Sequence, residues 1–379
     1  MLQVGDTATH AAFLAALASS HGYTTTVESY FDGELIGEVS IETGEVNVMS
    51  SNRDRRRLNF VAAENLWPAR VDDLLSPHGV WLRALVQISA GSHAFPPVPV
   101  FAGKLLTTTR RRRSGRLAVV AVDPFWQINR EAFETPRSAL LRTPIATLIR
   151  DLIVEVFPQA TLEDQTGSPA TVPSLGLLWD AAVGSRGAAI DELAASIGAE
   201  VFARPTRVWP QGDFVLRPVP QLGSGVAAWT LTDGLTGVVT DDQLKLDGEE
   251  VVNRWIVTVE PTGSSGTLYA VATDNDPGSP TRYGGPMGKL VDFWSSPLIG
   301  TLAQASQAAT AKLARTLGTG NARDLKVITN PALEGGDLIA VQMGDEATVW
   351  HVVDEFVVPL SVSTATMPIR TRAAVTTAD

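Results

Sequence analysis

The stretch Tyr23–Ile41, YTTTVESYFDGELIGEVSI, decides the fold class of this chain. Residues 24–30 are rich in β-branched and aromatic side chains, which favour a strand. The pair Asp32-Gly33 follows, and Asp-Gly between two such runs is the strongest short-range signal for a hairpin turn. The stretch therefore predicts two antiparallel strands, the second over residues 34–41.

Similar runs continue through the first third of the chain. A short helix carrying Phe13 and Leu17 on one face is expected within residues 1–22, and a second turn is expected at Thr43-Gly44. Further strand-like runs follow at 46–49, 57–61, 80–88, 98–109 and 117–122. Many short strands at close spacing are typical of an antiparallel barrel or sandwich, which we expect over about residues 23–130.

Helical spacing replaces the strand pattern in the middle of the chain. Thr143 is a good N-cap with proline after it, and apolar residues at helical spacing extend to Val156. A second helix is expected over Ala188–Ile197, with two short strands after it, so this segment predicts a small α/β module. Strand-like runs then return, the longest being Val251–Val259, and a further helix is expected over Thr301–Leu317.

The composition is that of a packed, soluble protein of several domains. The chain has 379 residues, of which 44% are hydrophobic and 19% charged, so two to four domains are expected. A formal net charge of −11 argues against a protein that grips nucleic acid with its whole surface. We expect neither a membrane span nor a signal peptide, because no long apolar run and no basic N-terminal region is present.

No catalytic or metal-binding motif stands out. The chain has no cysteine, and its 5 histidines lack the spacing of metal ligands. Residues Asp274–Gly278 have the wrong spacing for a calcium loop. Carboxylates are plentiful, so a paired-carboxylate hydrolase stays open by residue type, but the sequence singles out no pair. We therefore expect no catalytic residue, no metal ligand and no cofactor.

Two arginine clusters are the candidate interface residues. They lie at predicted strand ends and turns and comprise Arg53 with Arg55, Arg56 and Arg57, and then Arg110, Arg111, Arg112 and Arg113 with Arg116. One interpretation is phosphate binding. The other is charge at strand edges that pairs with acidic neighbours or with a partner subunit. The negative net charge and the absence of interleaved aromatic residues favour the second interpretation.

Short motifs recur in a recognisable order along the chain. In the first half they are FLAAL (13–17), VESYFDG (27–33), RRRL (55–58), LLSPHG (74–79), VDP (122–124) and FETPR (133–137). In the second half they are VNR (252–254), the 301–317 helix, LEGGDLI (333–339) and WHVVD (350–354). The first series resembles the minor tail proteins of actinobacterial phages, and the second is similar to tail hub proteins more broadly. The few lysines among the basic residues are typical of a GC-rich host.

Two of these motifs predict local contacts. Gly335 and Gly336 are expected in a tight turn between strands, where glycine permits a positive φ. The amide of Asn253 is expected to satisfy the backbone of a neighbouring loop. Both are scaffold roles.

The resemblance implies a fold that is mainly β with α+β insertions, namely two tail-tube-like antiparallel β-barrels plus smaller α/β modules. The implied divisions are an N-terminal helix or arm (1–22), a first barrel (23–135), an α/β module (136–224), a second barrel split into 225–265 and 331–373, an inserted loop–helix segment (266–330) and a tail (374–379).

The resemblance also implies a structural virion protein of the tail tip or baseplate, assembled in the host cytoplasm and not an enzyme. Hubs of this kind are trimers, and three chains with two barrels each match a sixfold tail tube on one side and a threefold tip on the other. The implied partners are two further copies, a distal tail or tail tube protein, tip, fibre or spike proteins, the tape measure protein, and DNA in transit through the channel. No membrane anchor is implied.

Three alternatives remain open. A tail-associated cell-wall hydrolase would need a carboxylate pair or a metal cluster in one cleft. A receptor-binding or glycan-binding tail-tip protein would use exposed aromatic residues such as Trp209. A hub of a related contractile injection machine would keep the fold in another context.

Overall fold

The computed structural model describes residues 1–173, 178–208, 211–222, 226–234, 237–246, 248–249, 251–259, 268–317, 321–361 and 366–373. The predicted tail, 374–379, and Trp209 lie outside these residues. Strands predominate, most of them in one large sheet, so the predicted class, mainly β with α+β insertions, is confirmed.

The first half of the large sheet begins with the predicted hairpin. β1 (Gly22–Phe31) and β2 (Glu34–Glu38) pair around Asp32-Gly33, where both residues have positive φ, and α1 (Thr7–Leu17) precedes them. The remaining elements of this half are β3 (Ile41–Met49), β4 (Arg56–Ala63), the short 3-10 helix η1 (Glu64–Leu66), β5 (Trp81–Ala90), β6 (His93–Ala94), β7 (Val98–Arg111) and β8 (Arg116–Val122).

The turn predicted at Thr43-Gly44 is wrong, because both residues lie within β3. A Cβ at position 44 would approach Cβ of Phe60 to 2.8 Å. Glycine at this position permits the close approach of β3 to β4, which is a different role from starting a turn.

The second half of the sheet is built by the C-terminal strands and by two strands from the middle of the chain. Its elements are β14 (Trp229–Thr232), β15 (Val239–Leu246), β19 (Asn321–Ile328), β20 (Leu338–Gln342), β21 (Val349–Pro359) and β22 (Thr366–Ala373). The predicted turn before β20 is present, with Gly336 at φ +84°.

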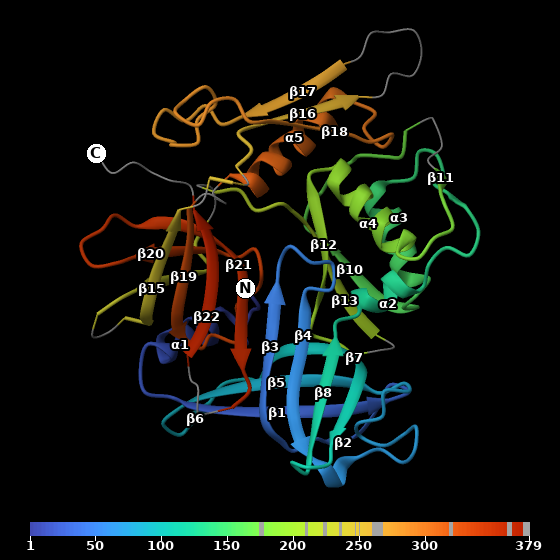
Figure 1. The fold of residues 1–379 in the computed structure, drawn as a ribbon, viewed down its shortest axis with the longest axis vertical. Helices are drawn as coiled ribbons and strands as arrows, with labels where there is room; N and C mark the ends of the chain where they lie inside the picture. Colours follow the sequence, from blue (N-terminus) through green and yellow to red (C-terminus); the bar gives the residue numbers. More distant parts are fainter. Residues whose placement is uncertain are drawn as a thin grey trace.

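The two halves form one continuous sheet where two barrels were expected. The strand order is β15-β19-β22-β21-β3-β4-β8-β7-β5-β1-β2, and β21 pairs antiparallel with β3, with Phe356 opposite Val48. Figure 1 shows the strands from β19 to β8 running side by side, with β1 and β5 crossing below them. The strand order has two free ends, β15 and β2, so among the described residues neither half closes into a ring, and one hydrophobic core, with Phe60 and Phe356 in it, serves both halves.

The α/β module follows β8. It comprises α2 (Phe125–Arg130), β9 (Arg137–Ser138), α3 (Ile145–Val154), β10 (Gln159–Asp164), β11 (Leu178–Trp179), α4 (Ser185–Ser196), β12 (Ala199–Arg204) and β13 (Gln211–Pro218). The two predicted helices are confirmed. α3 buries an apolar stripe that includes Leu148 and Leu152, and α4 ends before Gly198, which has φ +67°.

A small module completes the chain. Its sheet is β17 (Leu268–Thr273), β16 (Arg254–Val259) and β18 (Val291–Ser295), and α5 (Leu302–Thr316) packs on one side. Thr301 and Gln304 form a capping box that starts α5, and the helix predicted to begin at Thr301 is confirmed.

The small module corrects the predicted limits of the insertion. β16 was assigned to the second barrel, but it pairs with β17 and β18. β19 was assigned to the insertion, but it pairs with β15 and β22 of the large sheet. The insertion therefore runs from β16 to α5, because strand pairing and not position along the chain decides which sheet a strand joins.

Asn253 lies at the start of this insertion. Its Nδ2 donates to the carbonyl oxygens of Thr281 and Gly288, at 3.0 and 3.1 Å, and its Oδ1 accepts from the amide of Leu290 at 3.0 Å. The predicted scaffold role of this amide is confirmed.

Candidate assembly surface

The continuous sheet presents a broad, regular side to solvent. Eight neighbouring strands, from β15 through β19, β22, β21, β3, β4 and β8 to β7, are antiparallel throughout. Because side chains alternate along a strand, one residue in two points away from the core. We call this surface the open face; across its middle lie Gln243, Asp324, Arg370, Glu355 and Met49.

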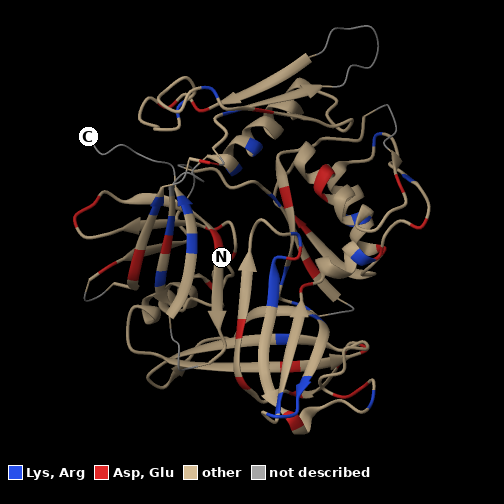
Figure 2. Ribbon diagram, viewed as in Figure 1, with Lys and Arg blue, Asp and Glu red and all other residues tan. Residues whose placement is uncertain are grey.

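The charges of the open face compensate one another. Lys326 Nζ lies 2.7 Å from Asp241 Oδ2, and Arg370 Nε lies 3.6 Å from Asp324 Oδ1. Figure 2 shows acidic and basic residues interspersed along these strands. Pairs this exposed contribute little to stability, so their effect is a surface without a strong field of either sign.

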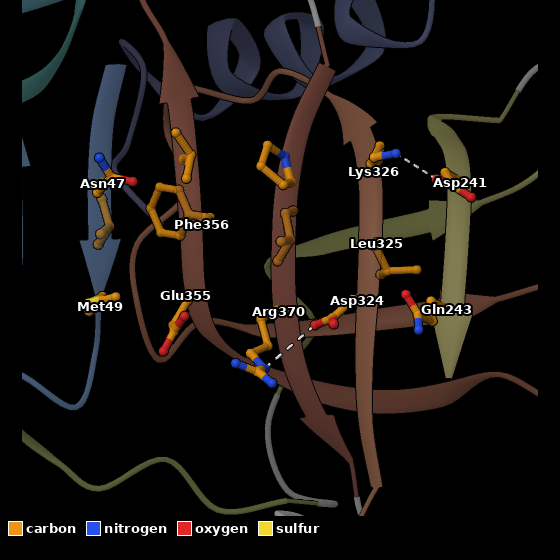
Figure 3. Close-up of a pocket in the computed structure, with 14 residues that line it drawn as sticks. Asn47, Met49, Asp241, Gln243, Asp324, Leu325, Lys326, Glu355, Phe356 and Arg370 are labelled. Carbon is orange, nitrogen blue, oxygen red and sulfur yellow. Dashed lines mark hydrogen bonds and ion pairs between the residues drawn. The ribbon is translucent and has the colours of Figure 1, made fainter. Parts of the chain in front are cut away.

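Part of the open face is hollowed. A depression of about 390 Å³ is lined by side chains of five neighbouring strands, among them Asn47, Asp241 and Glu355 (Figure 3). Two of the carboxylates that line the depression, Asp241 and Asp324, are paired with Lys326 and Arg370 on the neighbouring strands.

The two lateral ends of the open face are formed by different strands. β15 is exposed at almost every position, including Leu244 and Leu246, and among the described strands it pairs with β19 alone. β7 pairs with β5 only as far as Lys104, so its second half has a strand partner on one side alone, although Thr108 donates to the carbonyl of Leu75. The sequence did not indicate Leu244 and Leu246; the near absence of alternation in VTDDQLKL was the available signal.

The first arginine cluster lies where the large sheet meets the α/β module. Arg55 and Arg56 are buried, and only Arg57 of the three predicted interface residues is exposed. Arg55 Nη2 lies 3.0 Å from Glu200 Oε2 of β12, and its guanidinium stacks on Phe202, 4.4 Å from the ring centre.

Arg56 contacts residues of both the α/β module and the large sheet. It donates to the carbonyl of Ala203 at 3.2 Å, and its Nη2 lies 3.8 Å from Glu334, near the turn before β20. Asp123 accepts from the amide of Arg56 at 3.0 Å. The buried pair therefore ties the large sheet to the α/β module, a role that differs from the predicted contact with a neighbouring subunit.

The pKa values of the buried acids follow from this arrangement. Burial would raise the pKa of Glu200, but the charges of Arg55, Arg217 and Arg315 around it lower the pKa to about 2. Burial raises the pKa of Asp123 to about 7, against the opposing effect of two backbone hydrogen bonds. Glu200 is thus a charged partner at neutral pH.

The second arginine cluster is on the surface. Arg110 pairs with Glu64 at 2.6 Å and lies over the ring of Trp67, and Arg116 pairs with Glu42 at 2.7 Å. Arg111, Arg112 and Arg113 at the tip of the β7–β8 hairpin are exposed. This tip lies at the β7 end of the open face.

No group of three or more His, Asp or Glu side chains in the described part of the chain is placed to hold a metal ion. None of its helices is long and apolar enough to cross a membrane.

The fold has counterparts among solved structures, although no protein-family model and no curated protein matches the sequence. A tail protein from Neisseria meningitidis MC58 superposes with a TM-score of 0.63 at 14% identity, over 92% of this chain and 96% of that one. A 43 kDa tail protein of prophage MuSo2 from Shewanella oneidensis gives 0.58 at 10% identity, over 91% and 98%.

A third counterpart comes from a secretion machine. An Escherichia coli component of the type VI secretion system, described as structurally similar to the T4 tail proteins gp27 and gp5, gives a TM-score of 0.54 at 10% identity, over 92% of this chain and 79% of that one. Nearly the whole of this chain therefore has the tail-hub-like fold shared by phage tail proteins and a type VI secretion component.

Proposed function

We propose that this chain is the structural hub of a phage tail tip or baseplate, without enzymatic activity, and that three copies form a ring. The ring would join a sixfold tail tube, or the distal tail protein at its end, to a threefold tip carrying fibre or spike proteins. The tape measure protein and the transiting DNA would occupy its channel in turn. Its place is in the virion, after assembly in the host cytoplasm.

The observation that carries the proposal is a repeat within the open face. β15, β19, β22 and β21 form one antiparallel unit of four strands, and β3, β4, β8 and β7 form a second with the same alternation of directions. The chain joins the two units through β21 and β3. Repeating this junction between copies places β7 of one copy antiparallel beside β15 of the next, and three copies then supply six units.

The charge pattern supports the open face as the channel wall. Paired charges such as Asp241–Lys326 leave no basic track to hold phosphate groups. The overall charge of −11 agrees with a wall along which DNA slides.

The hairpin tip supplies the candidate contact between copies. Arg111, Arg112 and Arg113 project beside β7, and Arg57 and Arg110 lie on the same half of the sheet. β15 of the next copy would bring Asp241 and Asp242 near this region, and these two carboxylates, which pair with Lys326 and Arg323 within their own copy, could also contact the basic hairpin.

Solution mass by light scattering, followed by imaging, tests the proposal. We expect a particle of three times 40.3 kDa, seen as a ring with a pore. Leu244→Asp together with Leu246→Asp should convert it to monomers, whereas Leu302→Asp, an exposed leucine on α5, should leave the trimer intact. A chain that stays monomeric at high concentration, or that cleaves peptidoglycan, contradicts the proposal.

A further inference from the structure

The two four-strand units of the open face agree in strand register, pair by pair. In the first unit β19 pairs with β22, and Arg323 lies opposite Thr371. In the second unit β4 pairs with β8, and Leu58 lies opposite Ala121. Each of these ladders has seven pairs, and matching Arg323–Thr371 with Leu58–Ala121 matches all seven.

The register shifts of the two units coincide as well. They lie between Val239 and Asp241 in β15, between Ile41 and Thr43 in β3, between Val353 and Glu355 in β21, and between Leu105 and Thr107 in β7. When the units are aligned by the central ladders, the shift in β15 falls on the shift in β3, and that in β21 falls on that in β7. Because a bulge is a specific feature of a fold, two coincident bulges identify the units as a structural repeat.

The repeat gives each residue of β15 an equivalent in β3. Leu244 is equivalent to Val46, and Leu246 is equivalent to Val48. The two valines are buried where β3 pairs with β21, whereas Leu244 is 56% exposed and Leu246 is 73% exposed. The two leucines therefore occupy core positions of the repeat at an edge where the next strand is missing from the chain.

The repeat also makes β7 the equivalent of β21. Thr108 is equivalent to Phe356 and, two residues further on, Arg110 is equivalent to Val358. β21 pairs with β3 at these positions, whereas β7 beyond Lys104 has only β8 as a strand partner among the described residues. β7 thus presents the edge that β21 uses within the chain, and β15 presents the edge that β3 uses.

We propose that β7 of one copy pairs with β15 of the next in the same register that β21 and β3 have within the chain. The inference rests on the proposed trimer and specifies which residues meet at its contact. The pairs are Thr108 with Leu246, Thr109 with Lys245, Arg110 with Leu244, and Arg111 with Gln243 of the next copy. Two unlike edges give a head-to-tail contact, which closes into a ring when the rotation between copies is threefold.

The side chains of β7 on the core side suit the two leucines. The guanidinium of Arg110 lies over the ring of Trp67, 5.8 Å from its centre, and Trp67 is 42% exposed. Leu244 of the next copy would therefore lie against the stem of Arg110, beside an aromatic ring. Thr108 already donates its hydroxyl to a carbonyl oxygen of its own chain, so it requires no polar partner from Leu246.

The charges at the end of the two strands agree with the same register. Beyond the pair Arg111–Gln243, β7 continues into Arg112-Arg113, and β15, followed backwards, continues into Asp242-Asp241. Each of these carboxylates already has a basic partner on β19, so the hairpin arginines would share them. The agreement is independent support, because the register comes from backbone pairing and not from charge.

Engineered disulfides test the register, because the chain has no cysteine of its own. Residues directly opposite in an antiparallel pair have Cα atoms about 4.5–5.5 Å apart, within the span of a disulfide. Under mild oxidation, the full chain carrying Thr109→Cys and Lys245→Cys should form covalent trimers, with dimers as intermediates. The control pair is Thr109→Cys with Asp241→Cys, on the same side of the sheet but about 13 Å out of register along the strand, and it should form none.

The outcomes separate the register from the ring. Covalent trimers from the first pair alone support the inference. Covalent trimers from the control pair, with or without the first, keep the ring and overturn the register. A trimer by light scattering in which neither pair reacts keeps the trimer and overturns the contact of β7 with β15. A monomer in which neither pair reacts overturns the trimer and the inference together, and dimers from a single-cysteine variant show contact between like edges and overturn the inference.

Point variants on β15 give an independent measurement. Leu246→Asp places a charge on the core side of the contact, so trimer association should weaken about tenfold or more. Gln243→Asp, the same substitution on the open face and opposite Arg111, should not weaken it. Both positions are exposed in the single chain, so thermal unfolding of the monomer should be unchanged in both variants. Equal weakening in the two variants, or none in Leu246→Asp, would contradict the inference.

Discussion

The two arginine clusters are alike in sequence and opposite in the structure. Arg55 and Arg56 are buried between the large sheet and the α/β module, where Glu200 and Glu334 face them. Arg111 to Arg113 project into solvent from a hairpin. A run of arginines therefore has no fixed role. Its role depends on whether distant strands place carboxylates beside it: with such partners it joins parts of one chain, and without them it remains available to another molecule.

The largest effect on stability should come from the buried cluster. Glu200→Ala would leave Arg55 buried beside Arg217 without their shared partner, and breaking a buried ion pair in this way costs about 3–5 kcal/mol. The free energy of unfolding in urea measures this. Glu42→Ala, which removes the exposed partner of Arg116, is the matched control and should cost ~1 kcal/mol or less.

The pH dependence of stability should also come from the buried cluster. The pKa of Glu200 is lowered to about 2, so its contribution is present above the ordinary carboxylate pKa and is lost as the pH falls towards 2. The pKa of Asp123 is raised to about 7, so its effect has the opposite sign: stability is greatest below pH 4 and declines as the pH rises to 7.

Substitution separates these two effects. Thermal unfolding between pH 4 and 7 should decline less steeply in Asp123→Asn, and unfolding between pH 4 and 2 should decline less steeply in Glu200→Gln. Identical slopes in a variant and the unaltered chain would show that the residue does not titrate as described.

A smaller effect is expected where the second cluster touches its own chain. Arg110→Ala removes the exposed pair with Glu64 and the contact with Trp67, so the expected loss is about 0.2–1 kcal/mol. The loss should shrink in high salt, which screens exposed pairs. A salt-independent loss would indicate that packing on Trp67 accounts for it.

The smallest effect on folding should come from reversing the hairpin charges. Changing Arg110, Arg111, Arg112 and Arg113 to glutamate should leave the unfolding free energy of the monomer within about 1 kcal/mol, because three of the four are exposed and form no ion pair within the described part of the chain. If the hairpin tip meets an acidic strand of the next copy, the reversed variant should form fewer trimers, and its solution mass by light scattering should fall towards that of the monomer. Normal trimer formation by the reversed variant would show that the hairpin tip is not part of the interface between copies.

Local signals explain what could be predicted from the sequence. The β1–β2 turn and the start of α5 depend on residues within a few positions of each other, Asp32-Gly33 and Thr301 with Gln304, so both were predictable. The contacts of Asn253 were predictable for the same reason, since its loop partners follow in the same module.

Pairing between distant segments explains the rest. The burial of Arg55 depends on Glu200, and the union of the two predicted barrels depends on β21 reaching β3, neither of which any local pattern specifies. The place of β16 was mispredicted for a related reason. β16 was expected in the second barrel, and its pairing with β17 and β18 is identified only by the strand register in the structure.

The pairing of β21 with β3 has a consequence for biosynthesis. Met49 finds its partner Glu355 only after nearly the whole chain has left the ribosome, which takes on the order of tens of seconds at ordinary rates of translation. During that interval the backbone groups along one edge of β3 have no strand partner, and β21 of another nascent copy can pair with that edge. Slow translation or crowded polysomes should therefore yield strand-exchanged dimers, which would form in place of the monomer in which β21 pairs with β3 of its own chain.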